Sequence, residues 1–493
     1  MLKYLFTIIT FFFSTLIFGQ KLTARILDVS QNPIAFATIQ TAENKGVISN
    51  EEGFFTINLE NNSIKTIEIN SLGFSSKTIS IEEIKRNNYI VVLDEFIDVL
   101  SQVYVSNSIP DVNDIIYKAN NNLSTNYSNE NVKYNLFFRN TSFVDFNTLE
   151  FKIDKVSGLK KKQLTDANIA LEELTNSIIE SEAVYYRDYV ADLLIQNKEN
   201  SKLDVYKATR LLDKKRSFSI DDIQNKAQHL ILTYLDTTKT YKLKSGLFKI
   251  EDSLSLKSAD VKEKEEEHKN EYEATNLTSE SHDLIHKSQI YDDTQLKTIL
   301  DADLYSYQFE NTTVFNDQLV YIITYSPRKG KAKYSGKLYI TDENFAIIKL
   351  EYKYAKGKRG QKLNLKLLLG VKFIENLQSG IMIFKKNDEN IYQPLYLKEE
   401  SGNFFYVSRP LKMIENSFSK NKIGLNFKLE GNAKEKNEIY FINHNSISIS
   451  EYNSIIVKDK IHYQELKAYD PSIWAKYNAL EPLEEMKNFK SKD

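Results

Sequence analysis

Between residues 304 and 450, the chain is a nearly continuous succession of segments in which apolar and polar side chains alternate. A period of two is typical of β-strands that bury one face. The turns between these segments, such as residues 342–344 and 387–390, are too short to join parallel strands. We therefore expect a wide, curved antiparallel sheet. Its expected strands are residues 305–309, 319–325, 336–341, 346–354, 362–374, 380–384, 391–399, 403–409 and 423–429.

Short β-rich segments separated by turn-forming residues also recur between residues 21 and 106. About seven strands at a spacing of roughly 8–12 residues predict a small β-sandwich. A polar loop bounded by glycines at residues 46–53 contains Asn50, Glu51 and Glu52. These three side chains carry oxygen atoms of the kind that calcium prefers, but an ordinary hairpin loop is the preferred interpretation.

The region between the sandwich and the sheet mixes helical and strand patterns. Apolar residues spaced three and four apart predict helices at residues 112–123, 162–180 and 219–236. Residues 182–196 and 241–250 have the composition of strands.

The expected fold class is mainly β with α (α+β), an N-terminal β-sandwich followed by a large curved antiparallel sheet with helical insertions. A length of 493 residues agrees with about three domains. The expected organisation is a signal peptide at residues 1–20, the β-sandwich at 21–106, a helical linker at 107–130, an antiparallel-sheet domain at 131–450 with a helical and charged insertion around 251–300, and a helical tail at 451–493 that docks on the sheet.

The first residues have the pattern of a secretory signal. Lys3 precedes an unbroken run of apolar and hydroxyl residues from Tyr4 to Phe18, and Gly19 follows. An uncleaved membrane anchor is the alternative, but the run is shorter than the roughly 20 residues that a span needs, and no later segment approaches that length. The chain has no cysteine, which excludes disulfides and thiol chemistry. Export without disulfides indicates a periplasmic or outer-membrane-associated location.

Several short motifs follow one another in the first domain. They are Asp28 with Pro33-Ile34 and Phe36-Ala37, Gly46 with Ser49-Asn50, Gly53-Phe54, Leu72-Gly73-Phe74 and the exit segment at residues 100–105. These residues resemble the carboxypeptidase regulatory-like (transthyretin-like) domain that opens many exported proteins of Bacteroidetes, with Arg25 where that family usually has Gly. The resemblance implies a non-catalytic accessory module in a Bacteroidetes cell-envelope protein.

The resemblance extends into the next domain. Asn126-Tyr127 and the strand Phe137-Phe138-Arg139 resemble the larger Bacteroidetes envelope family that follows this module. That family usually has Glu after the Arg, whereas this chain has Asn140. A strand-edge side chain in solvent is the preferred interpretation of Arg139.

Two basic loops are the main candidates for ligand binding. They flank adjacent hairpins, so they could lie together at one end of the sheet and bind anionic groups such as lipid phosphates or an acidic glycan. Solvated hairpin tips that oppose aggregation are the alternative. The cations of these loops are Arg328, Lys329, Lys331, Lys333, Lys356, Lys358, Arg359 and Lys362.

Trp474 and a histidine pair are further candidates. With Tyr477, Trp474 resembles the closing motif of the same envelope family, and we expect it to seal a sheet edge; stacking on a ligand is the alternative. His282 and His286 share one face of a helix and so could bind zinc. However, Asp283 follows the first histidine where zinc proteases have Glu, and no third ligand is evident. Two exposed histidines are therefore preferred, and no metal or cofactor is expected.

The function has to be inferred without a catalytic motif, because no nucleophile elbow, phosphate loop, dinucleotide fingerprint or zinc-protease motif occurs. The balance of 65 basic and 67 acidic residues argues against nucleic-acid binding. We therefore expect an exported, non-catalytic binding or scaffold protein of the bacterial cell envelope, with an envelope protein or a lipid or glycan component as partner. A lipid-binding half-barrel carrier is the first alternative, and a periplasmic hydrolase or peptidase is the second.

Overall fold

The structure is a computed structural model of the chain. It describes residues 21–42, 45–59, 64–96, 111–128, 131–157, 160–180, 183–213, 238–245, 248–255, 270–316 and 318–491. Three predicted features lie outside the described residues, namely the signal peptide (1–20), the exit segment (100–105) and the helix at 219–236, and so do residues 256–269 of the charged insertion.

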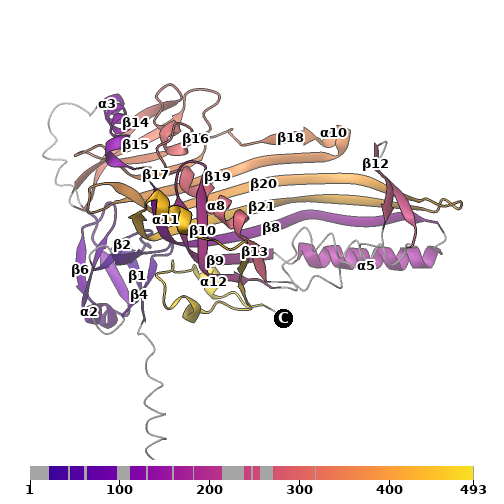
Figure 1. The fold of residues 1–493 in the computed structure, drawn as a ribbon, viewed down its shortest axis with the longest axis horizontal. Coiled ribbons are helices and arrows are strands. Elements are labelled where there is room, and N and C mark those ends of the chain that lie inside the picture. Colours follow the sequence, from indigo (N-terminus) through magenta and orange to yellow (C-terminus); the bar gives the residue numbers. More distant parts are fainter. Residues whose placement is uncertain are drawn as a thin grey trace, which may run out of the picture.

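The N-terminal region is a β-sandwich of two small sheets (Figure 1). One sheet has the strand order β4-β1-β7 and the other β3-β2-β5-β6. Inward-facing side chains of both sheets, such as Ile26, Phe55 and Ile69, are buried in a common core. A single helix, α2, joins β6 to β7, and the Ser80 hydroxyl caps it by accepting a hydrogen bond from the Glu83 amide. The elements are β1 (Lys21–Asp28), β2 (Thr38–Ala42), β3 (Lys45–Ile48), β4 (Phe54–Asn58), β5 (Thr66–Asn70), β6 (Lys77–Ser80), α2 (Ile81–Arg86) and β7 (Ile90–Leu93).

The expected large sheet is present, with 14 strands in the described part of the chain. Its main path runs β14-β15-β16-β17-β19-β20-β21-β8-β9-β10-β23, with β11 joined to β20 and β18 to β19. The pairs are antiparallel except for β10 with β23. The fold class predicted from the alternating pattern is thereby confirmed. The strands are β8 (Val132–Val156), β9 (Ala183–Ile195), β10 (Ser201–Leu211), β11 (Thr240–Ser245), β12 (Phe248–Ser255), β14 (Tyr305–Phe315), β15 (Gln318–Pro327), β16 (Tyr334–Thr341), β17 (Ile347–Tyr354), β18 (Lys362–Leu365), β19 (Val371–Lys386), β20 (Tyr392–Glu415), β21 (Lys422–Ser446) and β23 (Gln464–Leu466).

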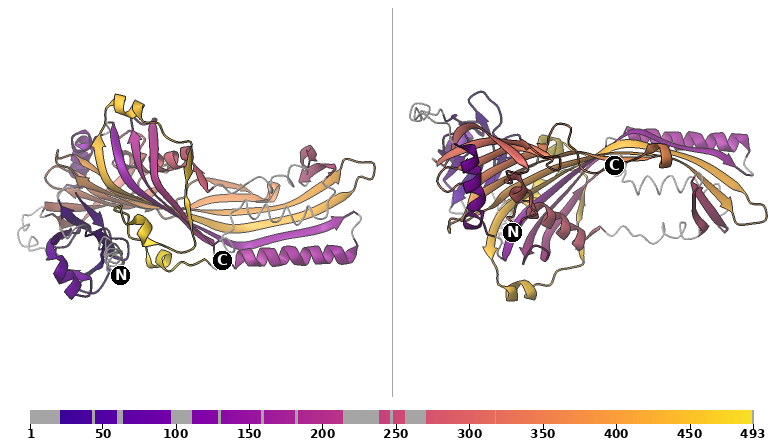
Figure 2. Two further views of the ribbon diagram at one scale, coloured as in Figure 1. Left: turned by 60° about the horizontal axis from the view of Figure 1, so that its bottom comes forward. Right: turned by 90° about the horizontal axis from the view of Figure 1, so that it is seen from above.

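Three long central strands run the length of an arm that extends to one side, and β11 and β12 of the same sheet lie near its far end (Figures 1 and 2). Strands β8, β20 and β21 have 25, 24 and 25 residues. At about 3.3 Å per residue, each is roughly 80 Å long. Helix α5 (Lys161–Ile179) lies along this arm, where Leu171 packs near Ile153 and Ile178 packs against Phe146.

Several strand boundaries differ from the prediction: β14 and β21 run past their expected ends, and β19 joins the end of the expected strand 362–374 to the expected strand 380–384. The expected strands at residues 391–399 and 403–409 are one continuous strand, β20, because the β19 and β21 ladders run past Gly402 on both sides. The prediction of a single strand at residues 362–374 is wrong. The chain reverses within it through the short helix α10 (Lys366–Leu369), and Gly370 ends that helix with a left-handed φ of 65°.

The reversal at Gly370 leads to a stability prediction. A Cβ atom at this position would lie 2.0 Å from the Ser408 carbonyl oxygen, and the positive φ disfavours any L side chain. We therefore expect Gly370→Ala to lower the free energy of unfolding by about 2 kcal/mol, measured by urea denaturation. The matched control is Gly330→Ala, since no atom lies within 4 Å of its added Cβ. Equal stability of the two variants would refute the strained reversal.

Helices cover one face of the main sheet, and the sandwich and the tail cover the other. Phe138 on β8 packs in the cluster that contains residues of α3, α4, α8 and α9, whereas its neighbour Phe137 packs with Trp474 of the tail. Consecutive strand residues point to opposite faces. The helices are α3 (Val112–Asn121), α4 (Leu123–Asn126), α8 (Ala274–His286) and α9 (Gln295–Ile299).

The C-terminal tail is partly helical, and it also adds the strand β23 to the edge of the main sheet. Upstream of β23, β22 pairs with β13 in a separate two-stranded sheet. Among the described residues, no helix combines the length and the apolar character that crossing a membrane requires. The remaining elements are β13 (Glu271–Glu273), α11 (Ile449–Ser454), β22 (Lys460–His462), the 3₁₀ helix η3 (Pro471–Trp474) and α12 (Glu484–Lys487).

Candidate functional site

A cavity of about 1020 Å³ lies between the sandwich and the main sheet. Phe36 and Leu72 line it from the sandwich side, and Ile383, Leu395 and Ile442 line it from strands β19, β20 and β21. These walls come from parts of the chain that are hundreds of residues apart. The cavity therefore depends on the docking of the sandwich against the sheet.

The polar lining of this cavity carries an excess of positive charge. Burial lowers the pKa of Lys385, against the opposing effect of Asp388. Burial also lowers the pKa of His444, and Lys385 adds to this effect. An acidic group that entered the cavity would meet more cations than anions. The charged lining residues are Lys45, Lys349, Lys385, Lys386, Asp388 and Glu389.

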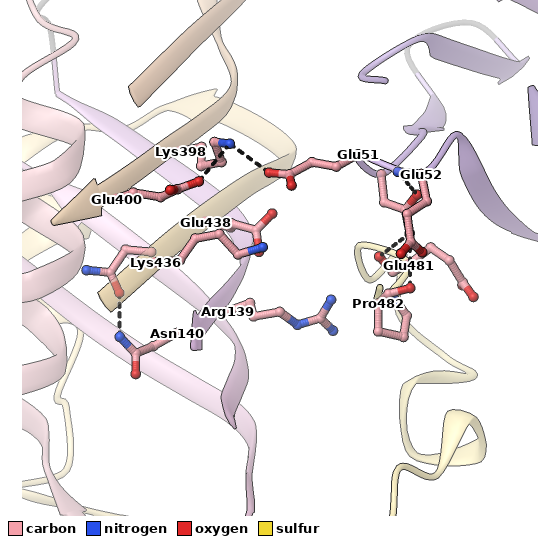
Figure 3. Close-up of polar contacts among 12 residues, drawn as sticks. Glu51, Glu52, Arg139, Asn140, Lys398, Glu400, Lys436, Glu438, Glu481 and Pro482 are labelled. Carbon is pink, nitrogen blue, oxygen red and sulfur yellow. Dashed lines mark hydrogen bonds and ion pairs between the residues drawn. The ribbon is translucent and has the colours of Figure 1, made fainter. Parts of the chain in front are cut away.

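Polar contacts next to the cavity hold the sandwich in place (Figure 3). The Glu51 carboxylate lies 2.7 Å from Lys398 Nζ on β20. Burial acts to raise the pKa of Glu51, but Lys436 and Lys398 outweigh it and hold that pKa below its usual value. Asn50 Nδ2 donates to the Pro482 carbonyl of the tail at 3.0 Å. The loop considered for calcium thus docks the sandwich on both the sheet and the tail.

A buried ion pair lies beneath the docked tail. Arg139 on β8 donates from Nε and Nη2 to the two carboxylate oxygens of Asp188 on β9, at 3.0 and 2.7 Å. The two side chains are only 4% and 0% exposed. Burial acts to lower the pKa of Arg139, but Asp188 and then Glu438 outweigh it, so the guanidinium stays protonated. The expectation that Arg139 is a solvent-exposed strand-edge residue is therefore wrong.

Asn140 has its own partners. Its Nδ2 donates to Asn437 Oδ1 at 2.7 Å (Figure 3), and its Oδ1 accepts from the Ser142 hydroxyl at 2.8 Å. Asn140 therefore belongs to a neutral network of amides and a hydroxyl beside the buried ion pair.

The two basic loops predicted from the sequence do lie together. The first connects β15 to β16 and the second connects β17 to β18. Lys358 Nζ donates to the Gly330 carbonyl at 2.8 Å, and the Ala355 amide donates to the Lys333 carbonyl at 2.9 Å. None of the eight predicted cations has a carboxylate within ion-pair distance in the described part of the chain. Their role in binding remains a prediction.

Trp474 packs within the tail-to-sheet contact. Its ring meets Phe137 edge-on, with centroids 5.4 Å apart, and Tyr477 at 6.4 Å. The residue is 3% exposed. Trp474 therefore packs on the face of the sheet at the interior strand β8 and not at a sheet edge, and little of its ring is open to a ligand.

His282 and His286 lie one turn apart on α8, with ring centroids 6.1 Å apart. His286 Nε2 is 3.6 Å from Asp293 Oδ1, and burial lowers the pKa of His282. Both rings are partly buried, not exposed as expected. Within the described ranges, no three His, Cys, Asp or Glu residues come close enough together to hold a metal ion.

The cavity residues were missed at the sequence level. Lys385 and Lys386 end a strand and precede a polar turn, which is an ordinary hairpin pattern. Nothing local marks them as facing a second domain. Their only signal is the adjacency of two lysines at the end of an apolar strand.

No protein-family model matches the chain, and no curated protein matches its sequence. A domain from Vibrio parahaemolyticus described as outer membrane lipoprotein-sorting is 7% identical, with a TM-score of 0.20 over 69% of this chain and 95% of that one. MucB of Pseudomonas aeruginosa, in complex with MucA, is 7% identical, with a TM-score of 0.16 over 64% of this chain and 93% of that one. Likenesses with TM-scores this low carry no argument about fold or function.

Proposed function

We propose that this chain is an exported, non-catalytic binding protein of the bacterial cell envelope, and that the cavity between the sandwich and the sheet is its ligand site. The cavity itself is the observation that carries the proposal. Its volume of about 1020 Å³ lies just above the range of roughly 300–1,000 Å³ that is usual for small-molecule sites. Domain interfaces are a preferred place for such sites.

The lining indicates the chemistry of the ligand. Apolar walls contributed by Phe36, Ile383 and Ile442 suit a hydrocarbon chain. Lys385 and Lys386 suit an acidic group at its end. An amphiphile with one hydrocarbon chain and one acidic group fits both requirements.

Two other functions are less well supported by the geometry. A half-barrel carrier would hold lipid on an open sheet face, but here helices α3, α8 and α9 pack on one face of the sheet, and the sandwich and the tail pack on the other. A zinc-dependent hydrolase would need a third ligand beside His282 and His286. The described residues provide no such cluster.

The test is native mass spectrometry of the full chain purified from its own envelope, before and after lipid extraction. We expect a bound amphiphile at one molecule per chain, and rebinding of laurate to the extracted protein in calorimetry. Dodecanol, which has the same chain without the acid, should bind more weakly. An empty protein that also fails to bind laurate would overturn the ligand site.

A further inference from the structure

The edge of the main sheet at β18 exposes three leucines. Strand β18 pairs with β19 alone, and α10 follows it directly (Figure 1). Leu367 and Leu368 in α10 are 104% and 75% exposed, and Leu363 in β18 is 47% exposed. Full exposure of adjacent leucines costs hydration free energy and contributes nothing to the core. Such side chains indicate an apolar phase that covers them.

The same edge is strongly basic. The loop that leads into β18 carries Lys356, Lys358, Arg359 and Lys362, and Lys366 lies beside the leucines. The hydrogen bond from Lys358 to the Gly330 carbonyl joins this loop to the basic loop between β15 and β16. The β18 strand and the α10 turn together span roughly 20 Å, so cations and leucines form one continuous surface.

Little negative charge lies within this surface. The neighbouring strand β19 contributes Glu375, whose carboxylate accepts a hydrogen bond from the Gln361 amide at 2.7 Å. None of the loop cations forms an ion pair with a described carboxylate. The surface therefore retains a net positive charge that calls for anions outside the chain.

We propose that the β18 edge docks on an anionic lipid surface, with Leu367 and Leu368 inserted between the lipids and the basic loops on the headgroups. A protein partner fits less well, because the area of three protruding leucines is much smaller than the roughly 800 Å² per partner that a stable protein interface buries. A few inserted apolar side chains beside a cluster of Lys and Arg are sufficient for binding at a bilayer surface. This proposal does not rest on the cavity.

The first test is co-sedimentation of the full chain with vesicles of equal parts phosphatidylglycerol and phosphatidylcholine. We expect binding to these vesicles, little binding to pure phosphatidylcholine, and weakening as the salt concentration rises. The double variant Leu367→Ser/Leu368→Ser should reduce partitioning at least about tenfold. Neutralising Lys356, Lys358, Arg359 and Lys362 to Gln should also reduce it at least about tenfold. Ile456→Ser is the matched control, since this isoleucine is 93% exposed outside the β18 edge.

The second test measures insertion directly. The native Trp474 is 3% exposed, so a new tryptophan dominates collisional quenching by brominated lipids. Leu367→Trp should be quenched on anionic vesicles, and Ile456→Trp should not. Equal quenching of both variants, unchanged binding of the leucine variant, or binding blocked by millimolar inorganic phosphate alone would overturn membrane docking. Loss of laurate binding with vesicle binding intact would bear only on the cavity.

Discussion

Asp188→Ala is expected to lower the free energy of unfolding by about 4 kcal/mol, since it leaves the Arg139 guanidinium buried without its partner. Both donors of Arg139 that face Asp188 lie at hydrogen-bond distance, and the pair is almost fully excluded from solvent. Glu438 adds to the local field but does not accept these two bonds. The measurement is urea denaturation followed by the fluorescence of Trp474, whose ring packs against the neighbouring Phe137.

Two controls separate this effect from a general sensitivity of strands β8 and β9. Lys133→Ala removes a more exposed ion pair between the same strands, 3.7 Å from Asp192, and should cost less than about 1 kcal/mol. The double variant Arg139→Met/Asp188→Leu removes both charges and should recover most of the lost stability. A cost of Asp188→Ala no greater than that of Lys133→Ala would contradict the assignment.

The large sheet could be predicted because its pattern is local. Alternation of side chains with a period of two specifies a strand with one covered face, and short polar turns specify antiparallel neighbours. The helix at 162–180 was predicted from apolar spacing and is present as α5. The same local pattern cannot tell whether a strand continues or reverses. The chain reverses at Gly370, where the backbone has a left-handed φ. Strand β20 continues through Gly402 because it pairs with β19 on one side and with β21 on the other.

The burial of Arg139 could not be predicted, because its partner is set by register. Asp188 lies 49 positions along the chain and meets Arg139 only because β8 and β9 align these two residues directly. A shift of one residue would turn Asp188 to the other face. The neighbouring Arg187 shows this, since it pairs with Glu280 of α8 on the helical side of the sheet.

The position of the basic loops could be predicted from a local pattern, but the cavity could not. The two basic loops flank adjacent hairpins, so the sequence allowed them to lie together at one end of the sheet, and the hydrogen bond from Lys358 to the Gly330 carbonyl joins them there. The cavity instead requires the packing of a whole domain. Contacts such as Glu51 with Lys398 and Tyr440 with the Gly46 carbonyl hold the sandwich against the sheet. No sequence pattern in the sandwich or in the sheet predicts these contacts.

Reversing two charges in the cavity should nearly abolish binding of an acidic amphiphile. In Lys385→Glu/Lys386→Glu, two attractive charges become repulsive at the place proposed for the acidic group. Charge-assisted contacts contribute about 1.5–3 kcal/mol each, so we expect the Kd for laurate to rise about 100-fold, measured by calorimetry. Binding of dodecanol should change little, because it carries no acid.

The matched control for this charge reversal is Lys85→Glu/Arg86→Glu on α2, where both side chains are exposed and outside the cavity lining. It changes the net charge of the chain by the same amount, so it reports any long-range effect of charge alone. Burial lowers the pKa of Lys385, and an acidic ligand beside it would raise that pKa again. Laurate affinity should therefore fall as the pH rises through the pKa of the bound lysine. Equal loss of laurate binding in both double variants would place the ligand elsewhere, since Lys385 and Lys386 belong to the cavity lining and Lys85 and Arg86 do not.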